Sequence, residues 1–217
     1  MINVRWPQNI KDAKALQLKL RHKIKITPLS KPPNYIAAAD AGFKNDDVIG
    51  AVCVYDFENL EYICHETAVR KAVFPYIPGY LTFREGPALV DAINKLSIRP
   101  DVIIFDGQGI AHPNGMGIAS HIGVILDIPT IGCAKSRLIG SFKEPGKKKG
   151  MWSPLIYNEE STGAVLRTRD NVRPLFVSPG HKTDIKTSIE IVLRCTGAYR
   201  IPLPQRCADM LTKKKGR

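Results

Sequence analysis

Two aspartates follow apolar runs directly, where a buried strand would carry them to the edge of a sheet. Asp40 closes the run IAAA, and Asp106 closes the run VIIF and precedes a glycine-rich turn. If the two strands are neighbours, their carboxylates repel each other unless they share a cation. Hard oxygen ligands of this kind suit Mg²⁺, with Mn²⁺ as a substitute. The pair therefore predicts a divalent metal site, although either acid alone could simply form a turn.

Two further acids could complete such a site. Glu85 comes just before a predicted helix at 86–97, and Asp209 lies near the C-terminus. By itself, each is more typical of a helix cap or a turn than of a metal ligand. They become candidates only if the fold brings them to Asp40 and Asp106.

The elements that must position these acids alternate between strand-like and helical patterns. Three strand-like segments with short connectors predict an antiparallel meander at 35–43, 48–56 and 61–73. Helical periodicity predicts helices at 8–25, 86–97, 116–126 and 184–195, with strands at 101–106 and 130–137 and a more irregular stretch at 150–180. This order predicts an α/β fold with a mixed central sheet, in which three antiparallel meander strands precede parallel strands and helices flank both faces.

The chain is strongly basic, with 32 Lys and Arg against 20 Asp and Glu and a formal charge of +12. Such an excess favours a polyanionic partner such as nucleic acid; plain solubility or the lysine-rich composition of a heat-loving organism are the alternatives. Two basic segments, KEPGKKKG at 143–150 and a tail at about 211–217, are predicted to be mobile and to add phosphate affinity without specificity. No apolar run is long enough for a membrane helix, and no signal-peptide pattern opens the chain.

The cysteines bear on the cellular setting. The chain has five, an odd number, and contains no C-x-x-C pair. This favours a reducing, cytoplasmic setting with neither a zinc site nor a disulfide framework. The length and the continuous alternation of elements favour one domain over residues 1–217.

Four sequence blocks, in order, resemble the signature motifs of the endonuclease V family. They are PYIPGYLTFRE at 75–85, DGQGIAHP at 106–113, GIASHIGVILDIPTIGCAKSRL at 117–138 and PLFVSPGH at 174–181. The resemblance extends from about Asp40 to Asp209 and implies a ribonuclease H-like fold. It also implies an endonuclease that cuts nucleic acid near inosine, the product of adenine deamination.

By this resemblance, Asp40, Glu85 and Asp106 match the acidic metal ligands of the family. Lys135, in CAKSRL, matches a lysine that meets the scissile phosphate. Asp209 falls where family members carry either Asp or His, although PLPQRCAD departs from their usual wording. Phosphodiester hydrolysis needs such groups, because divalent ions can generate hydroxide and offset the charge on the phosphate oxygens, and a lysine adds a fixed positive partner.

The same resemblance implies how a base would be recognised. Tyr76, stiffened by a proline on either side, matches an aromatic wedge that holds open the gap left by a displaced nucleotide. An aromatic between prolines is otherwise commonly a packing residue. The matching pocket positions, where glycines let the backbone approach the base, are Gly79, Leu81, His112, Gly117 and Ile118. Gln108 stands where many relatives have histidine, so it either bonds a phosphate or points elsewhere.

The leading expectation is a Mg²⁺-dependent, cytoplasmic, monomeric endonuclease of DNA repair. As the family implies, it would cut the second phosphodiester bond 3′ to deoxyinosine and leave 3′-hydroxyl and 5′-phosphate ends. The same chemistry on inosine-containing RNA stays open, because no residue identifies the preferred sugar. A non-catalytic ribonuclease H-like binding module would typically lack one or more of the acids. A resolvase or transposase-like nuclease would have no need of the PYIPG and GIASH blocks.

Overall fold

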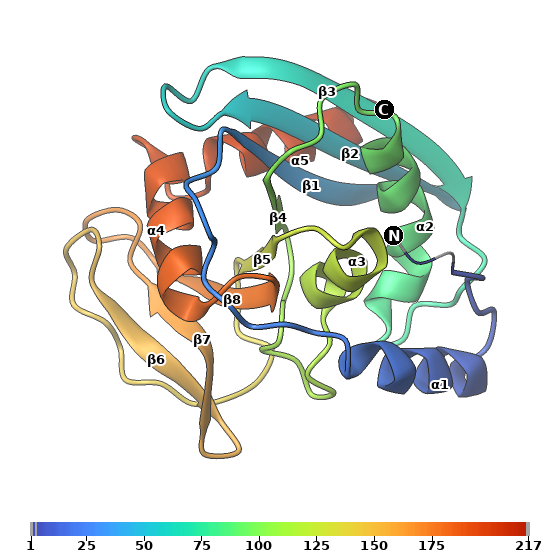
Figure 1. The fold of residues 1–217 in the computed structure, drawn as a ribbon, viewed down its shortest axis with the longest axis horizontal. Coiled ribbons are helices and arrows are strands. Elements are labelled where there is room, and N and C mark those ends of the chain that lie inside the picture. Colours follow the sequence, from blue (N-terminus) through green and yellow to red (C-terminus); the bar gives the residue numbers. More distant parts are fainter. Residues whose placement is uncertain (1, 3, 216–217) are drawn as a thin grey trace.

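The computed structural model describes residues 2 and 4–215, and within them the strands form one eight-stranded mixed sheet. The strands are β1 (Tyr35–Lys44), β2 (Asp47–Asp56), β3 (Tyr62–Lys71), β4 (Val102–Phe105), β5 (Thr130–Ala134), β6 (Trp152–Tyr157), β7 (Glu160–Leu166) and β8 (Leu175–His181). Their spatial order is β3-β2-β1-β4-β5-β8-β7-β6, which runs in Figure 1 from β3 at the top to β6 at the lower left. The strands that carry the predicted acids, β1 and β4, are therefore neighbours in the middle of the sheet.

The strand directions confirm the predicted α/β fold with a mixed sheet. β1, β2 and β3 form the antiparallel meander, while β4 is parallel to β1 and β5 is parallel to β4. β8, β7 and β6 then continue the sheet in antiparallel pairs. The stretch 150–180, predicted to be irregular, supplies these last three strands. Its pattern is weak because Pro154 lies within β6 and the β6–β7 pairing shifts register after Leu155.

Helices cover both faces of the sheet, as predicted. They are α1 (Ile10–Arg21), α2 (Leu81–Asn94), α3 (Ile118–Leu126), α4 (Ile185–Thr196) and α5 (Leu203–Lys215). Alternate residues of the central strands enter two different cores. Ala39 and Phe105 pack in the core that contains residues of α2 and α3, whereas Ala38 and Ile104 pack in the core that contains residues of α4. α5 packs against β1 and β2.

Helix α2 begins at Leu81, five residues before the predicted start, so Glu85 belongs to the helix rather than preceding it. Pro87 lies inside the helix instead of in its first turn, where it cannot donate a hydrogen bond to the carbonyl of Phe83. The sequence pattern placed the start too late because proline commonly marks the first turn of a helix. Glu85 is consequently fixed on the buried face of α2.

The C-terminal segment also differs from the prediction. The tail expected at about 211–217 is helical through Lys215 as the end of α5, and residues 216–217 lie outside the described residues. A disulfide joins Cys53 of β2 to Cys207 of α5, with a Cα–Cα distance of 6.2 Å. The prediction of no disulfide was therefore wrong, because 154 residues separate these cysteines and only the packing of α5 brings them together. The cysteine pattern thus gives no argument for a reducing compartment.

Within the part of the chain that the structure describes, no helix has the length and apolar character needed to cross a membrane. The other basic segment, 143–150, contains no helix or strand, as predicted. Lys148 and Lys149 of this loop contact Asp170.

Candidate active site

The register of the two central strands brings the two key aspartates together. The parallel pairing of β1 with β4 extends to Ala39 opposite Phe105, so Asp40 and Asp106 are the next residues of their strands. The backbone N–H of Asp106 still donates to the carbonyl of Ala39 at 3.3 Å. Aligned residues of neighbouring strands direct their side chains to the same face. The two carboxylates therefore meet at one edge of the sheet, as the sequence predicted.

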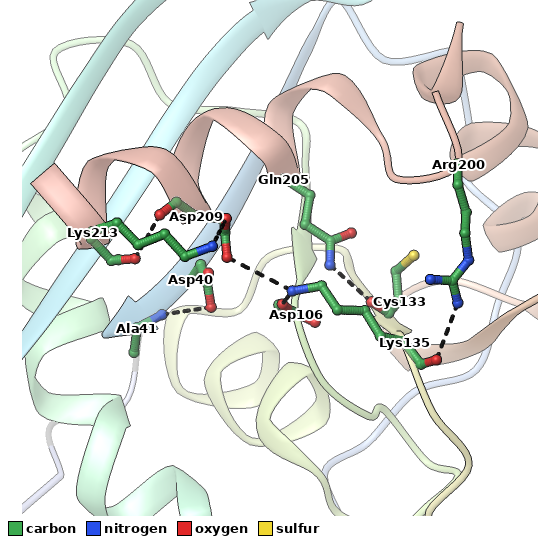
Figure 2. A network of polar contacts seen from close by, with 10 residues as sticks. Asp40, Ala41, Asp106, Cys133, Lys135, Arg200, Gln205, Asp209 and Lys213 are labelled. Carbon is green, nitrogen blue, oxygen red and sulfur yellow. Dashed lines mark hydrogen bonds and ion pairs between the residues drawn. The ribbon is translucent and has the colours of Figure 1, made fainter. Parts of the chain in front are cut away.

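Lys135 and Asp209 join this pair from two other elements. Lys135 directly follows β5, and its ammonium forms an ion pair with Asp106 and lies 3.8 Å from Oδ1 of Asp209. Asp209 lies on α5 and pairs with Lys213 one turn later at 2.6 Å. Figure 2 shows the ammonium of Lys135 reaching toward Asp106 and Asp209, with Asp40 close by. Side chains from β1, β5, α5 and the end of β4 thus form one polar network.

Glu85 completes the acidic cluster from helix α2, where it is only 8% exposed. Burial, followed by the charges of Asp40 and Asp106, raises the pKa of Glu85 to about 8. Burial and the charge of Asp106 raise the pKa of Asp40 to about 7, although Lys135 opposes this shift. Burial and the neighbouring carboxylates therefore shift both acids toward their protonated forms.

The donor set of the cluster fits a hard divalent cation, because all four candidate ligands are carboxylates. Burial is the largest cause of the raised pKa values of Asp40 and Glu85, and a bound cation would counter the second cause, the repulsion from neighbouring carboxylates. As they stand, the described residues contain no group of three or more Asp, Glu, His or Cys side chains arranged to hold a metal ion. Lys135 and Lys213 instead hold Asp106 and Asp209 in ion pairs. A cation would have to compete with these two ammonium groups.

A cavity of about 380 Å³ opens beside the acidic cluster. All six residues predicted to contact a base line it, namely Tyr76, Gly79, Leu81, His112, Gly117 and Ile118. Asp106 and Lys135 line the same cavity, so the predicted base pocket and the acidic cluster are adjacent. Tyr76 is 69% exposed, which excludes the alternative that it is a buried packing residue.

Close approach of backbone segments shapes this cavity. Gly79 has a φ of +83°, a left-handed conformation that favours glycine, and it lies next to the ring of His112. A Cβ atom at Gly117 would lie 2.3 Å from the carbonyl oxygen of Gln108, so a side chain there would force the loop to shift. Burial lowers the pKa of His112 to about 4. Its ring is therefore neutral at pH 7 and can contact a substrate through hydrogen bonds rather than charge.

Three residues support the segment that carries Lys135; the sequence singled out Gln108, whereas Arg200 and Gln205 were missed. The side-chain amide of Gln108 donates to the carbonyl of Ser136 at 3.2 Å, so this departure from the family pattern holds the lysine loop. Arg200 donates to the carbonyl of Lys135 at 3.1 Å, and Gln205 donates to a carbonyl of β5 at 3.0 Å. Gln205 belongs to the PLPQRCAD block, but neither it nor Arg200 carried a signal that pointed to this role.

Comparison with known proteins agrees with this geometry. The model of the Endonuclease V family matches residues 18–210. Endonuclease V of Trichormus variabilis is 49% identical over 97% of this chain and 96% of that protein. The crystal structure of Endonuclease V from Streptomyces avermitilis has a TM-score of 0.94 and 37% identity, covering 99% of this chain and 96% of that chain.

A further solved structure contains nucleic acid. It is Endonuclease V of Ciona intestinalis in complex with a 24mer DNA containing an inosine followed by a ribo-adenosine. It has a TM-score of 0.84 and 29% identity and covers 96% of this chain and 98% of that chain. The chain therefore belongs to the endonuclease V family, a family of metal-dependent nucleases with a ribonuclease H-like fold.

Proposed function

We propose that this protein is a Mg²⁺-dependent endonuclease that recognises deoxyinosine in DNA and hydrolyses the second phosphodiester bond on its 3′ side. The products would carry a 3′-hydroxyl and a 5′-phosphate. One observation carries the proposal: Asp106 and Lys135 belong both to the acidic cluster and to a cavity large enough for a purine base. A nucleotide whose base occupies this cavity places the following phosphates of its strand beside the carboxylates. The inosine in the Ciona intestinalis complex supports this choice of base.

The proposed catalytic residues have different tasks. Asp40, Glu85, Asp106 and Asp209 would hold the divalent ion, for which Mn²⁺ could substitute. Bound there, the ion would supply positive charge to the scissile phosphate and lower the pKa of an attacking water. Lys135 would donate a charge-assisted hydrogen bond to a non-bridging phosphate oxygen, in exchange for its present ion pair with Asp106.

Base recognition is assigned to the walls of the cavity. Hypoxanthine differs from adenine by a 6-oxo group and a protonated N1, and backbone groups at Gly79 and Gly117 could hydrogen-bond these atoms because no side chain separates them from the base. Leu81 and Ile118 supply apolar contacts to its faces. Tyr76, exposed at the cavity, would stack in the gap that the displaced nucleotide leaves.

The setting of the activity is proposed on broader grounds. The net charge of +12 favours binding to a nucleic-acid backbone. We expect residues 1–217 to act as one catalytic domain and as a monomer, in the repair of deaminated DNA. The cytoplasm is the proposed location, since the proposed substrate is cellular DNA.

Inosine-containing RNA is the second candidate substrate. The observation that favours it is the ribo-adenosine that follows the inosine in the Ciona intestinalis complex. A ribonucleotide at this position carries its 2′-hydroxyl next to the bond between the first and second nucleotides after inosine. The acidic cluster and the cavity would serve either sugar.

A paired nicking assay tests the proposal. DNA and RNA strands of the same sequence, each with one inosine, are incubated with the protein and Mg²⁺, and strands with adenine in its place serve as controls. Cutting of the DNA at the second bond 3′ to inosine is the expected result, and Asp106→Ala should abolish it. Preferential cutting of the RNA would transfer the same site to the second substrate. Cutting of neither strand would contradict the proposal and favour a non-catalytic binding module.

A further inference from the structure

A second cavity shares Lys135 with the base pocket. It has a volume of about 150 Å³ and is lined by Lys135, Ile201, Gln205, Arg206, Asp209 and Met210. Lys135 lines both cavities, so the side chain assigned to the scissile phosphate borders each of them. The second cavity is smaller than the base pocket, and its lining includes two cations, Lys135 and Arg206, which suit a phosphate.

The cation that distinguishes this second cavity is Arg206, an exposed residue on α5. Its guanidinium carbon lies 3.9 Å from the ring centroid of Tyr199, which is itself 45% exposed. None of the ion pairs among the described residues involves Arg206. A planar cation stacked on an aromatic face is held in place without being neutralised, which is how proteins present arginine to a phosphate.

The segment that carries this cation is tied to the catalytic lysine. Arg200 lies between Tyr199 and the start of α5, and its guanidinium donates to three backbone carbonyls. One of these belongs to Lys135 at 3.1 Å, and another to Pro174 at 2.9 Å. Figure 2 shows Arg200 bonded to the backbone of Lys135, on the side of the network away from Asp40. Arg206 is thus held in a defined position relative to the site of phosphate cleavage.

The acid in the second cavity does not oppose an anion there. Asp209 forms an ion pair with Lys213 at 2.6 Å, and Lys135 is a further cation at 3.8 Å. Lys135 pairs with Asp106 and Lys213 pairs with Asp209, so among the described cations here Arg206 is the one that no ion pair neutralises. Arg206 therefore presents its positive charge to an approaching phosphate.

We propose that Arg206, stacked on Tyr199, binds the backbone phosphate that follows the scissile phosphate on its 3′ side. This inference rests on the proposed function, because it needs the inosine in the first cavity and the cut at the second bond beyond it. With the base on one side of Lys135, the strand passes the carboxylates and continues over the second cavity. Arg206 is a binding residue for the departing strand, which becomes the product with a 5′-phosphate.

The test combines a substitution in the protein, Arg206→Ala, with a truncation of the substrate strand. One inosine strand extends several nucleotides beyond the cut, and a second ends so that the phosphate after the scissile one is missing. For the unchanged protein, losing this phosphate should raise KM about tenfold, the value of one charge-assisted contact. Arg206→Ala should raise KM for the long strand by about the same factor, and truncation should then cost it nothing more.

The matched control is Arg99→Ala. Arg99 is also exposed, but it precedes β4 whereas Asp106 follows it, so it lies at the opposite end of this strand. This variant should respond to truncation as the unchanged protein does. In addition, the salt dependence of binding to the long strand should lose about 0.7 in log–log slope with Arg206→Ala, as expected for one single-strand phosphate contact.

The outcomes separate this inference from the function on which it rests. If truncation costs Arg206→Ala as much as it costs the unchanged protein, the phosphate is bound elsewhere and the inference is wrong. If the unchanged protein cuts adenine and inosine strands alike but shows the same cycle, Arg206 keeps its role while inosine recognition fails. If the unchanged protein cuts no strand, the proposed function itself fails. Binding then tests Arg206 independently: equal salt dependence of binding for the unchanged protein and for Arg206→Ala would show that Arg206 does not contact the phosphate.

Discussion

The acidic cluster makes Mg²⁺ binding depend on pH, and the size of the effect follows from the structure. In the metal-free protein the pKa of Asp40 is about 7 and that of Glu85 is about 8. Both carboxyl groups must be ionised to act as ligands, so Mg²⁺ has to displace whatever protons they hold. The affinity for Mg²⁺ should therefore fall as the pH falls below these values.

The expected change is large. With pKa values of about 7 and about 8, lowering the pH from about 8 to about 6 weakens binding roughly tenfold through Asp40 alone and roughly 500-fold through both groups. The free energy of unfolding of the metal-free protein depends on the protonation of the same two carboxyl groups. Because the folded-state pKa values are raised above the usual values of 3.8 and 4.5, these two groups stabilise the fold most at low pH, and this contribution is lost as the pH rises through about 7 and about 8. Mg²⁺ should restore it.

Isothermal titration calorimetry checks this directly. Mg²⁺ is titrated at three pH values across this range, in two buffers with different ionisation enthalpies, so that affinity and proton release are both measured. Glu85→Gln removes one of the two titrating carboxyl groups, so the Mg²⁺ affinity of this variant should change only roughly tenfold over the same pH range, through Asp40. Glu160→Gln, an exposed change on β7, should leave the full dependence. Equal Mg²⁺ affinity at all three pH values without proton release would refute the reasoning.

Three further predictions concern separate parts of the molecule. Tyr76→Ala should weaken binding to inosine DNA by about 1–3 kcal/mol in fluorescence anisotropy while Mg²⁺ binding stays the same, and unchanged DNA affinity would exclude the wedge. Gly117→Ala should lower the free energy of unfolding by about 1–3 kcal/mol and slow nicking, because its Cβ would clash with the loop after β4; normal values of both would contradict the close packing. Reductant should lower the melting temperature of the unchanged protein and of the Cys64→Ser variant, which keeps the disulfide. It should not change that of Cys207→Ser, because a disulfide stabilises the fold by about 2–4 kcal/mol through its restriction of the unfolded chain. Equal effects of reductant on all three would exclude a stabilising disulfide.

The convergence of Asp40 and Asp106 could be predicted from the sequence, because each follows an apolar run that only a buried strand explains. Once β1 and β4 pair in parallel, the register that ends at Ala39 and Phe105 places the two acids side by side. The sequence also grouped the six residues that line the cavity beside the acidic cluster, but through the resemblance of whole sequence blocks rather than through local patterns. Tyr76 and Ile118 are 42 positions apart, and no periodicity connects them.

Other features depended on longer-range packing. The helix that carries Glu85 begins before the proline that usually marks a start, because its buried face stabilises the extra turn. β6 and β7 show weak alternation, and the pairing of β6 with β7 and of β7 with β8 supplies what their own pattern does not. In both places tertiary contacts outweighed the local signal.

The sequence by itself thus determined the α/β class, the apolar strand segments that Asp40 and Asp106 follow, and the residues that match a nuclease family. Only the tertiary structure decided that α5 docks on β1 and β2, and this one event positions Asp209, Lys213, Arg206 and the disulfide partner of Cys53. The physical reason is that periodicity records which face of an element is buried, whereas the partner of that face depends on how distant elements pack. The second cavity beside Lys135 exists only through that packing.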